Sequence, residues 1–115
     1  MNTSPQEDAR EFISIFDPER KQSTETAFAL VTEEYKELIS AFWELRKHQV
    51  NISPSKTKSS RNEFLKELAD LVYVCFQMAE RLNMDLDQAV RLVHQSNLSK
   101  LDENGKPIYL SLIHI

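Results

Sequence analysis

The chain has 115 residues, of which 41% are hydrophobic and 28% are charged, with a formal net charge of −4 at pH 7. This composition is typical of a folded globular protein, and the acidic balance gives no support for binding to nucleic acid or to a membrane surface. The length suits one domain with a modest core, which assembly with further copies would enlarge. One Gly and four Pro leave few tight turns, so helices are expected.

The first expected helix begins near Ser4 and ends before Pro18. Ser4 and Glu7 have the spacing of a capping box, and Pro5 suits the first helical position. Apolar residues then recur at the spacing of a single helical face: Ala9, Phe12, Ile13 and Phe16.

A second, longer helix is expected from residue 23 or 24 to about residue 48. Its apolar residues alternate steps of three and four, as on a helix that packs along a neighbour: Phe28, Val31, Tyr35, Leu38, Phe42 and Leu45. Glu34 falls at the border of this apolar seam, Glu37 lies further round the helix, and Glu33 lies furthest out. The helix therefore has an acidic edge beside its hydrophobic edge.

The polar segment from Gln49 to Ser60 contains Pro54 and is expected to be a loop. Ser60 and Glu63 then form a second capping-box pattern, which predicts the start of a central helix that runs to about Leu82.

The central helix is apolar nearly all the way round, a pattern that is normal for a buried helix. Glu67 and Asp70 nevertheless stand three residues apart within it, so their carboxylates share one face. An ionised carboxylate without a partner is costly in such a place, and we expect these two to meet cations or strong donors. The single Cys75 is expected to be a core thiol.

A shorter fourth helix is expected after a break at residues 83–85. Asp85 and Gln88 have the spacing of a helix cap, and four apolar residues should face inward: Leu86, Ala89, Val90 and Val93. Residues 102–107 read as a turn. The whole pattern predicts an all-α protein, a four-helix antiparallel bundle.

We expect residues 1–109 to form a single all-α domain. Residues 110–115 (LSLIHI) fit none of the preceding patterns and look like the translated end of a sequencing adaptor, so we expect a non-native tail there. No signal peptide and no membrane-spanning run is recognisable, which makes a cytoplasmic protein the default expectation.

Two acidic pairs carry the chemistry: Glu34 with Glu37, and Glu67 with Asp70. Antiparallel packing of the two long helices would bring the four carboxylates together, and such a group requires cations. Carboxylate oxygens favour Mg²⁺, or Mn²⁺, over zinc, and Mg²⁺ often completes its shell with substrate phosphates. A Glu-Glu-x-x-Glu run alone is more often a solvated helix face, so the prediction depends on both pairs.

These pairs, followed by Asn97-Leu98-Ser99-Lys100 and Gly105-Lys106, make residues 27–109 resemble the MazG-like all-α nucleoside triphosphate pyrophosphohydrolases. The chain is most similar to the branch of dimeric dUTPase-like and phosphoribosyl-ATP pyrophosphohydrolase-like enzymes. One departure is the 29 residues between Glu37 and Glu67, at or beyond the usual upper limit. We expect the insertion to lie in the polar segment 49–60 and to leave the helices in register.

The resemblance implies a set of metal ligands that hold Mg²⁺ against the triphosphate: Glu34, Glu37, Glu67 and Asp70. It implies a role for Glu33 beside Glu34 in catalysis, in which Glu33 orients or deprotonates the attacking water. Asn97 and Lys100 would contact the phosphates. Trp43 is a candidate for the base pocket, although aromatic residues at helical spacing are more often part of a core.

The implied activity is a Mg²⁺-dependent nucleotide pyrophosphohydrolase that releases pyrophosphate and a nucleoside monophosphate, with dUTP or dCTP favoured by the branch. The alternatives are a phosphoribosyl-ATP pyrophosphohydrolase and a non-catalytic helical regulatory or interaction module. The long apolar seam and the small size predict a homodimer or a higher homo-oligomer, with the bundle completed by dimerisation.

Overall fold

The computed structural model describes residues 2–50, 54–101 and 103–106. Within these ranges the chain forms four helices and no strand: α1 (Pro5–Phe16), α2 (Thr24–Val50), α3 (Pro54–Arg81) and α4 (Leu86–Leu98). The expected all-α class is thus confirmed. No helix in the described ranges has the length and apolarity needed to cross a membrane. Residues 110–115 lie outside the described ranges.

Helix α1 begins as its sequence predicts. The backbone N–H of Glu7 donates to Ser4 Oγ at 3.1 Å, and the backbone N–H of Ser4 donates to Glu7 Oε1 at 3.2 Å, which completes the capping box. Ala9 and Ile13 are buried on the face that packs against α3. After the helix ends, Asp17 accepts a 2.7 Å hydrogen bond from Arg81 and ties the connection to α3.

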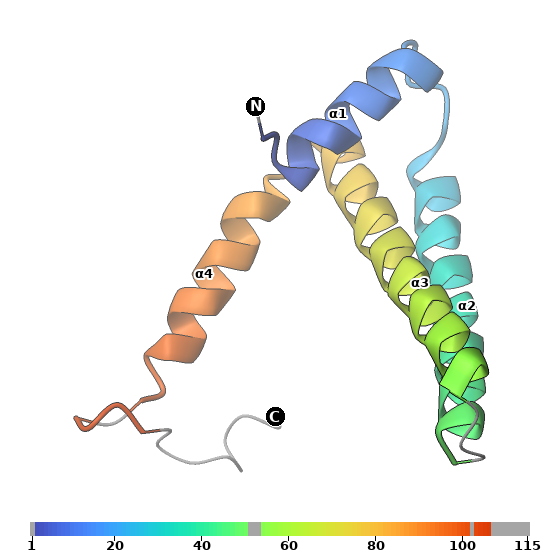
Figure 1. Ribbon diagram of the computed structural model, residues 1–115. Coiled ribbons are helices and arrows are strands. Elements are labelled where there is room, and N and C mark those ends of the chain that lie inside the picture. The colour runs from blue at the N-terminus through green and yellow to red at the C-terminus, as the bar shows by residue number, and fades with distance from the viewer. Residues whose placement is uncertain (1, 51–53, 102, 107–115) are drawn as a thin grey trace.

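Helices α2 and α3 lie antiparallel and side by side, and they form the main packing contact of the fold (Figure 1). Small or apolar side chains are buried between them: Ala27, Ala41, Leu45 and Phe76. The rings of Phe42 and Phe64 meet across the pair, with centroids 6.0 Å apart. This antiparallel pair positions the acidic residues.

The expected loop at residues 49–60 is helical, apart from residues 51–53, which lie outside the described ranges. Helix α2 continues to Val50, and α3 already begins at Pro54. Pro54 stands at the first helical position, where the N–H that proline lacks is not needed. The predicted capping box at Ser60 and Glu63 is therefore wrong, because Ser60 lies inside α3. The extra residues between the two acidic pairs therefore extend helices α2 and α3 instead of forming a long loop.

Helix α4 begins with the predicted cap, in which the Gln88 backbone N–H donates to Asp85 Oδ1 at 3.0 Å. It then diverges from the α2–α3 pair, so that the four helices outline an inverted V with α1 at its apex (Figure 1). No residue of α4 is buried, and Val93, expected to face inward, is 60% exposed. The inward prediction is wrong for a single chain, because no helix among the described residues buries this face.

The arrangement leaves much apolar surface open. The radius of gyration is 18.0 Å, whereas a compact chain of this length has about 13 Å. Helix α3, expected to be buried all round, exposes a row of large apolar side chains: Leu65, Leu68, Val72 and Tyr73. Cys75 is half-buried rather than a core thiol.

A buried side chain joins three helices at the apex. Gln6 donates from Nε2 to Glu80 Oε2 at 2.8 Å and accepts from the Leu86 backbone N–H at 3.0 Å. Glu80 also accepts from Arg10 Nε at 2.9 Å. Asn83, between α3 and α4, has φ of +56°, a left-handed conformation that asparagine tolerates better than most residues.

Candidate metal and substrate site

Three carboxylates meet between α2 and α3. Glu34, Glu67 and Asp70 each offer one oxygen atom, and these oxygens all lie within 4.8 Å of one another. Glu67 and Asp70 share a face of α3 because they are three residues apart, and the antiparallel packing places Glu34 of α2 opposite them. The structure thus brings together three of the four carboxylates that the sequence indicates.

Two oxygen atoms of this cluster are buried without a donor. Glu34 Oε2 and Glu67 Oε2 have no hydrogen-bond partner in the part of the chain that the structure describes, and Glu67 is only 5% exposed. A buried carboxylate oxygen without a partner loses its hydration and gains nothing in return. The two atoms therefore indicate that a proton or a cation completes the cluster.

The electrostatics of Glu34 lead to the same conclusion. Burial raises the pKa of Glu34, and the neighbouring carboxylates of Glu37, Asp70 and Glu67 raise it further. A carboxyl group in this position is poorly stabilised as an anion unless a positive charge stands beside it.

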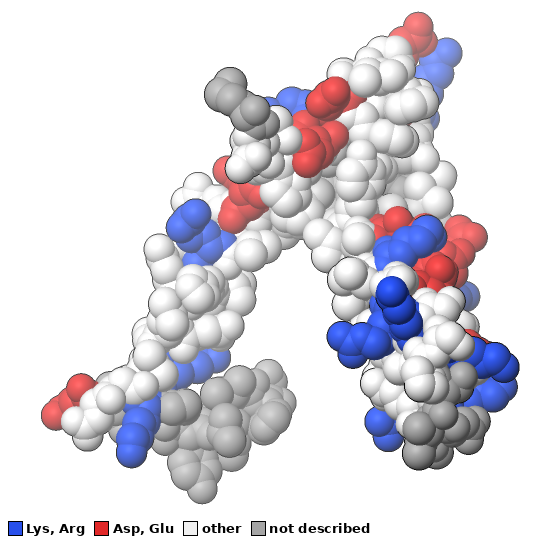
Figure 2. All heavy atoms as spheres, in the orientation of Figure 1, with Lys and Arg blue, Asp and Glu red and all other residues white. Residues whose placement is uncertain are grey.

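Lys66 supplies one such charge at the edge of the cluster. Its Nζ lies 3.1 Å from Asp70 Oδ2 and 3.5 Å from Glu67 Oε1, and the hydrogen bond to Asp70 is the main cause of the raised pKa of Lys66. Figure 2 shows basic atoms beside acidic ones partway along the α2–α3 pair. The sequence reasoning missed Lys66, although its position four residues before Asp70 is a recognisable ion-pair spacing.

The other two acidic candidates lie at the periphery. Glu37 is exposed and outside the group of three, although its charge acts on Glu34. Glu33 is exposed on α2, on the solvent side that its helical position predicts.

A pocket of about 500 Å³ opens between α2 and α3 beside the cluster. It shares Glu37 and Glu67 with the acidic region, and the rest of its lining is small or polar: Ser40, Ala41, Glu44, Ser59, Ser60 and Glu63. The pocket and the carboxylates together form the candidate site.

Three predicted substrate contacts do not reach this site within one chain. Trp43 is 64% exposed, contacts the Phe42 ring edge-on with centroids 5.1 Å apart, and does not line the pocket. Asn97 lies at the end of α4 and accepts a 3.2 Å hydrogen bond from Lys100. This end of α4 points away from the α2–α3 pair (Figure 1).

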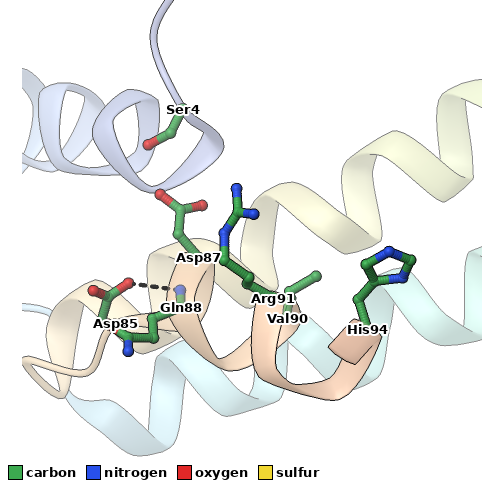
Figure 3. A pocket seen from close by; sticks show the side chains of 7 residues that line it. All are labelled: Ser4, Asp85, Asp87, Gln88, Val90, Arg91 and His94. Carbon is green, nitrogen blue, oxygen red and sulfur yellow. Dashed lines mark hydrogen bonds between the residues drawn. The ribbon is translucent and has the colours of Figure 1, made fainter. Parts of the chain in front are cut away.

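A second hollow, of about 720 Å³, lies between the start of α1 and α4, and Figure 3 shows the residues that line it: Ser4, Asp85, Asp87, Gln88, Val90, Arg91 and His94. Asp85 is already engaged as the cap of α4. None of the lining side chains is buried, and they include both acidic and basic groups. The hollow lacks the buried, unpartnered atoms that distinguish the α2–α3 site.

Comparison with known protein families identifies a family to which most of the chain is similar. A family model described as phosphoribosyl-ATP pyrophosphohydrolase matches residues 5–97, from the first turn of α1 almost to the end of α4. No curated protein and no solved structure matches the chain.

Proposed function

Because the chain belongs to the phosphoribosyl-ATP pyrophosphohydrolase family, whose members are hydrolases that act on phosphoric anhydrides, we propose that it cleaves a nucleotide to release pyrophosphate. The observation that carries this proposal is the pair of buried, unpartnered oxygens on Glu34 and Glu67. A cation bound to these two oxygens would supply the partner that they lack and could also bind the substrate phosphates.

The donor set fits a hard divalent cation, since three converging carboxylates offer oxygen ligands and no sulfur or nitrogen. We propose Mg²⁺, or Mn²⁺ in its place, held by Glu34, Glu67 and Asp70, with Glu37 as an outer ligand. When bound, such an ion neutralises charge on the phosphate oxygens.

The chain's own residues supply the other elements of the proposal. Lys66 holds the Asp70 carboxylate in position through its 3.1 Å contact. Glu33 is exposed one residue before Glu34, and we assign it the orientation or deprotonation of the attacking water. Asn97 and Lys100 offer an amide and a positive charge for phosphate oxygens.

The first candidate substrate is phosphoribosyl-ATP, because the matching family is named for it. The sequence resemblance to the dUTPase-like branch favours dUTP or dCTP instead, but neither the family match nor the described site supports that preference. We retain these two nucleotides as rivals to be tested side by side.

We further propose that the protein acts as a homodimer. Two apolar surfaces lie open along the arms of the V: the exposed row of side chains on α3 and the unburied α4. A second copy of the chain would cover both surfaces. In such a dimer, α4 of one copy lies along the α2–α3 pair of the other. Asn97 and Lys100 would then reach the partner's carboxylates, which they do not approach in their own chain.

A substrate panel tests the proposed activity. The protein is incubated with Mg²⁺ and phosphoribosyl-ATP, dUTP or dCTP, and pyrophosphate release is measured. Release from phosphoribosyl-ATP that is lost in Glu67→Gln and retained in Glu25→Gln, an exposed acid in the first turn of α2, is the expected result. Absence of pyrophosphate with every nucleotide would contradict the proposal.

A further inference from the structure

The pocket beside the carboxylates is lined mostly by hydroxyl and carboxyl groups in the part of the chain that the structure describes. Its α2 wall carries Ser40 and Glu44, one and two turns beyond Glu37, and its α3 wall carries Ser60 and Glu63, two turns and one turn before Glu67. None of the described residues that line it is aromatic, and none of them is Lys or Arg. Glu67, with its buried and unpartnered Oε2, belongs to this lining as well as to the cluster.

This lining selects against two parts of a nucleotide. Phosphate groups would be repelled by the carboxylates of Glu44 and Glu63, since the described lining contains neither Lys nor Arg and His48 contacts only Glu44 of the two. A nucleobase would find no aromatic face on which to stack. A sugar fits the lining better, because its hydroxyl groups donate to carboxylates, and serine hydroxyls both donate and accept.

The pocket depends on the unexpectedly long helices. Ser59 and Ser60 belong to the part of α3 that extends into the segment expected to be a loop. One contact fixes this extension against α2, in which the Thr57 hydroxyl donates to the His48 carbonyl at 3.2 Å. A second contact lies within α2, where His48 Nε2 is 3.2 Å from Glu44 Oε2. The second contact holds the Glu44 carboxylate at the pocket wall.

We propose that this pocket binds the sugar of the nucleotide and recognises its hydroxyl groups, so that the protein prefers ribonucleotides to the matching 2′-deoxynucleotides. The inference rests on the proposed function, which places the phosphates at the adjoining carboxylates. Ser60 and Glu63 are then specificity-determining residues. They face the pocket without belonging to the group of three carboxylates.

The test measures binding separately from turnover. Calorimetry with Mg²⁺ compares the α,β-imido analogues of UTP and dUTP, which share a base and differ by one hydroxyl. The wild-type protein should bind the ribose analogue roughly tenfold more tightly, as a hydrogen bond to a charged acceptor allows. Glu63→Ala and Ser60→Ala should bring the ratio of the two affinities close to one, because the contact with the extra hydroxyl is lost. Glu25→Ala, a matched substitution in the first turn of α2, should keep the wild-type ratio.

The outcomes separate this inference from the activity on which it rests. Equal affinity for both analogues, or a ratio unchanged by Glu63→Ala, overturns the sugar pocket even if pyrophosphate is released. A ribose preference that depends on Glu63, in a protein that hydrolyses no nucleotide, supports the pocket and overturns the proposed activity. Failure to bind either analogue overturns the sugar pocket, and pyrophosphate release from phosphoribosyl-ATP then tests the activity independently.

Discussion

Glu34 of α2 and Glu67 of α3 face each other across the antiparallel helix pair, and each has one buried carboxylate oxygen without a hydrogen-bond donor in the described chain. Asp70 brings a third carboxylate to within 4.8 Å, and Lys66 contacts Asp70 Oδ2 and Glu67 Oε1 but neither of the two unpartnered oxygens. Two carboxylate anions that lie so close together repel each other, and this repulsion lowers the stability of the folded chain.

Removal of one charge should not weaken the metal-free fold. In EDTA, Glu67→Gln replaces a buried anion with a neutral amide of the same shape, so we expect its thermal midpoint to equal or exceed that of the wild type. Thermal unfolding followed by circular dichroism measures this midpoint. A clear fall would indicate that Glu67 is stabilised by a partner within the protein.

Divalent cations should stabilise the wild-type protein. At a Mg²⁺ concentration ten times its Kd, linkage predicts about 1.4 kcal/mol of added stability, because the ion binds only the folded cluster. The same titration on Glu67→Gln should give a much smaller shift in the thermal midpoint. An equal shift in both proteins would place cation binding elsewhere.

The proposed dimer predicts complementation between two inactive variants. Glu67→Gln disables the carboxylates, and Lys100→Ala disables the phosphate end of α4. The two variants are mixed, denatured and refolded, so that about half of the dimers contain one chain of each. If α4 contributes to the partner's site, each mixed dimer has one intact site of two, and about a quarter of the wild-type activity should return. No recovery in dimers whose mass is verified by light scattering would place both residues in one subunit's site.

Acid should destabilise the apex of the fold. The hydrogen bonds from Arg10 and Gln6 hold the pKa of Glu80 below its ordinary value of 4.5. The unfolded chain therefore binds a proton more readily, and the contribution of Glu80 to stability is present above about pH 4.5 and is lost as the pH falls through the folded pKa.

Urea unfolding of the wild type and of Glu80→Gln across this range isolates the effect of Glu80. The difference in unfolding free energy between the two proteins should shrink as the pH falls. A difference that stays constant with pH would show that the Glu80 charge has no such role.

Local sequence patterns predicted much of the fold because they act within a few residues. The caps at Ser4 and Asp85 and the ends of α1 need only neighbouring side chains and the backbone. The same holds for the spacing of Glu67 and Asp70, which fixes their common face. Helical spacing and antiparallel packing together were enough to place Glu34 with them.

Other features depend on information that the spacing does not contain. The polar composition of residues 54–60 correctly indicates exposure to solvent, but a solvated helix satisfies this as well as a loop does. The apolar face of α4 indicates that Val93 should pack against a neighbour. It does not indicate whether that neighbour belongs to the same chain or to a second copy. The pocket near Ser60 could not be predicted, because the helix that carries Ser60 was itself expected to start there.

The central claim is that the α2–α3 carboxylates hold a divalent cation with which the protein releases pyrophosphate. The most direct measurement is pyrophosphate release from phosphoribosyl-ATP by the wild type and by Glu67→Gln, each with Mg²⁺ and with EDTA. We predict release by the wild type with Mg²⁺ only, and a loss of at least roughly 100-fold in the variant. Equal release by the variant, or release by the wild type that persists in EDTA, would contradict the account.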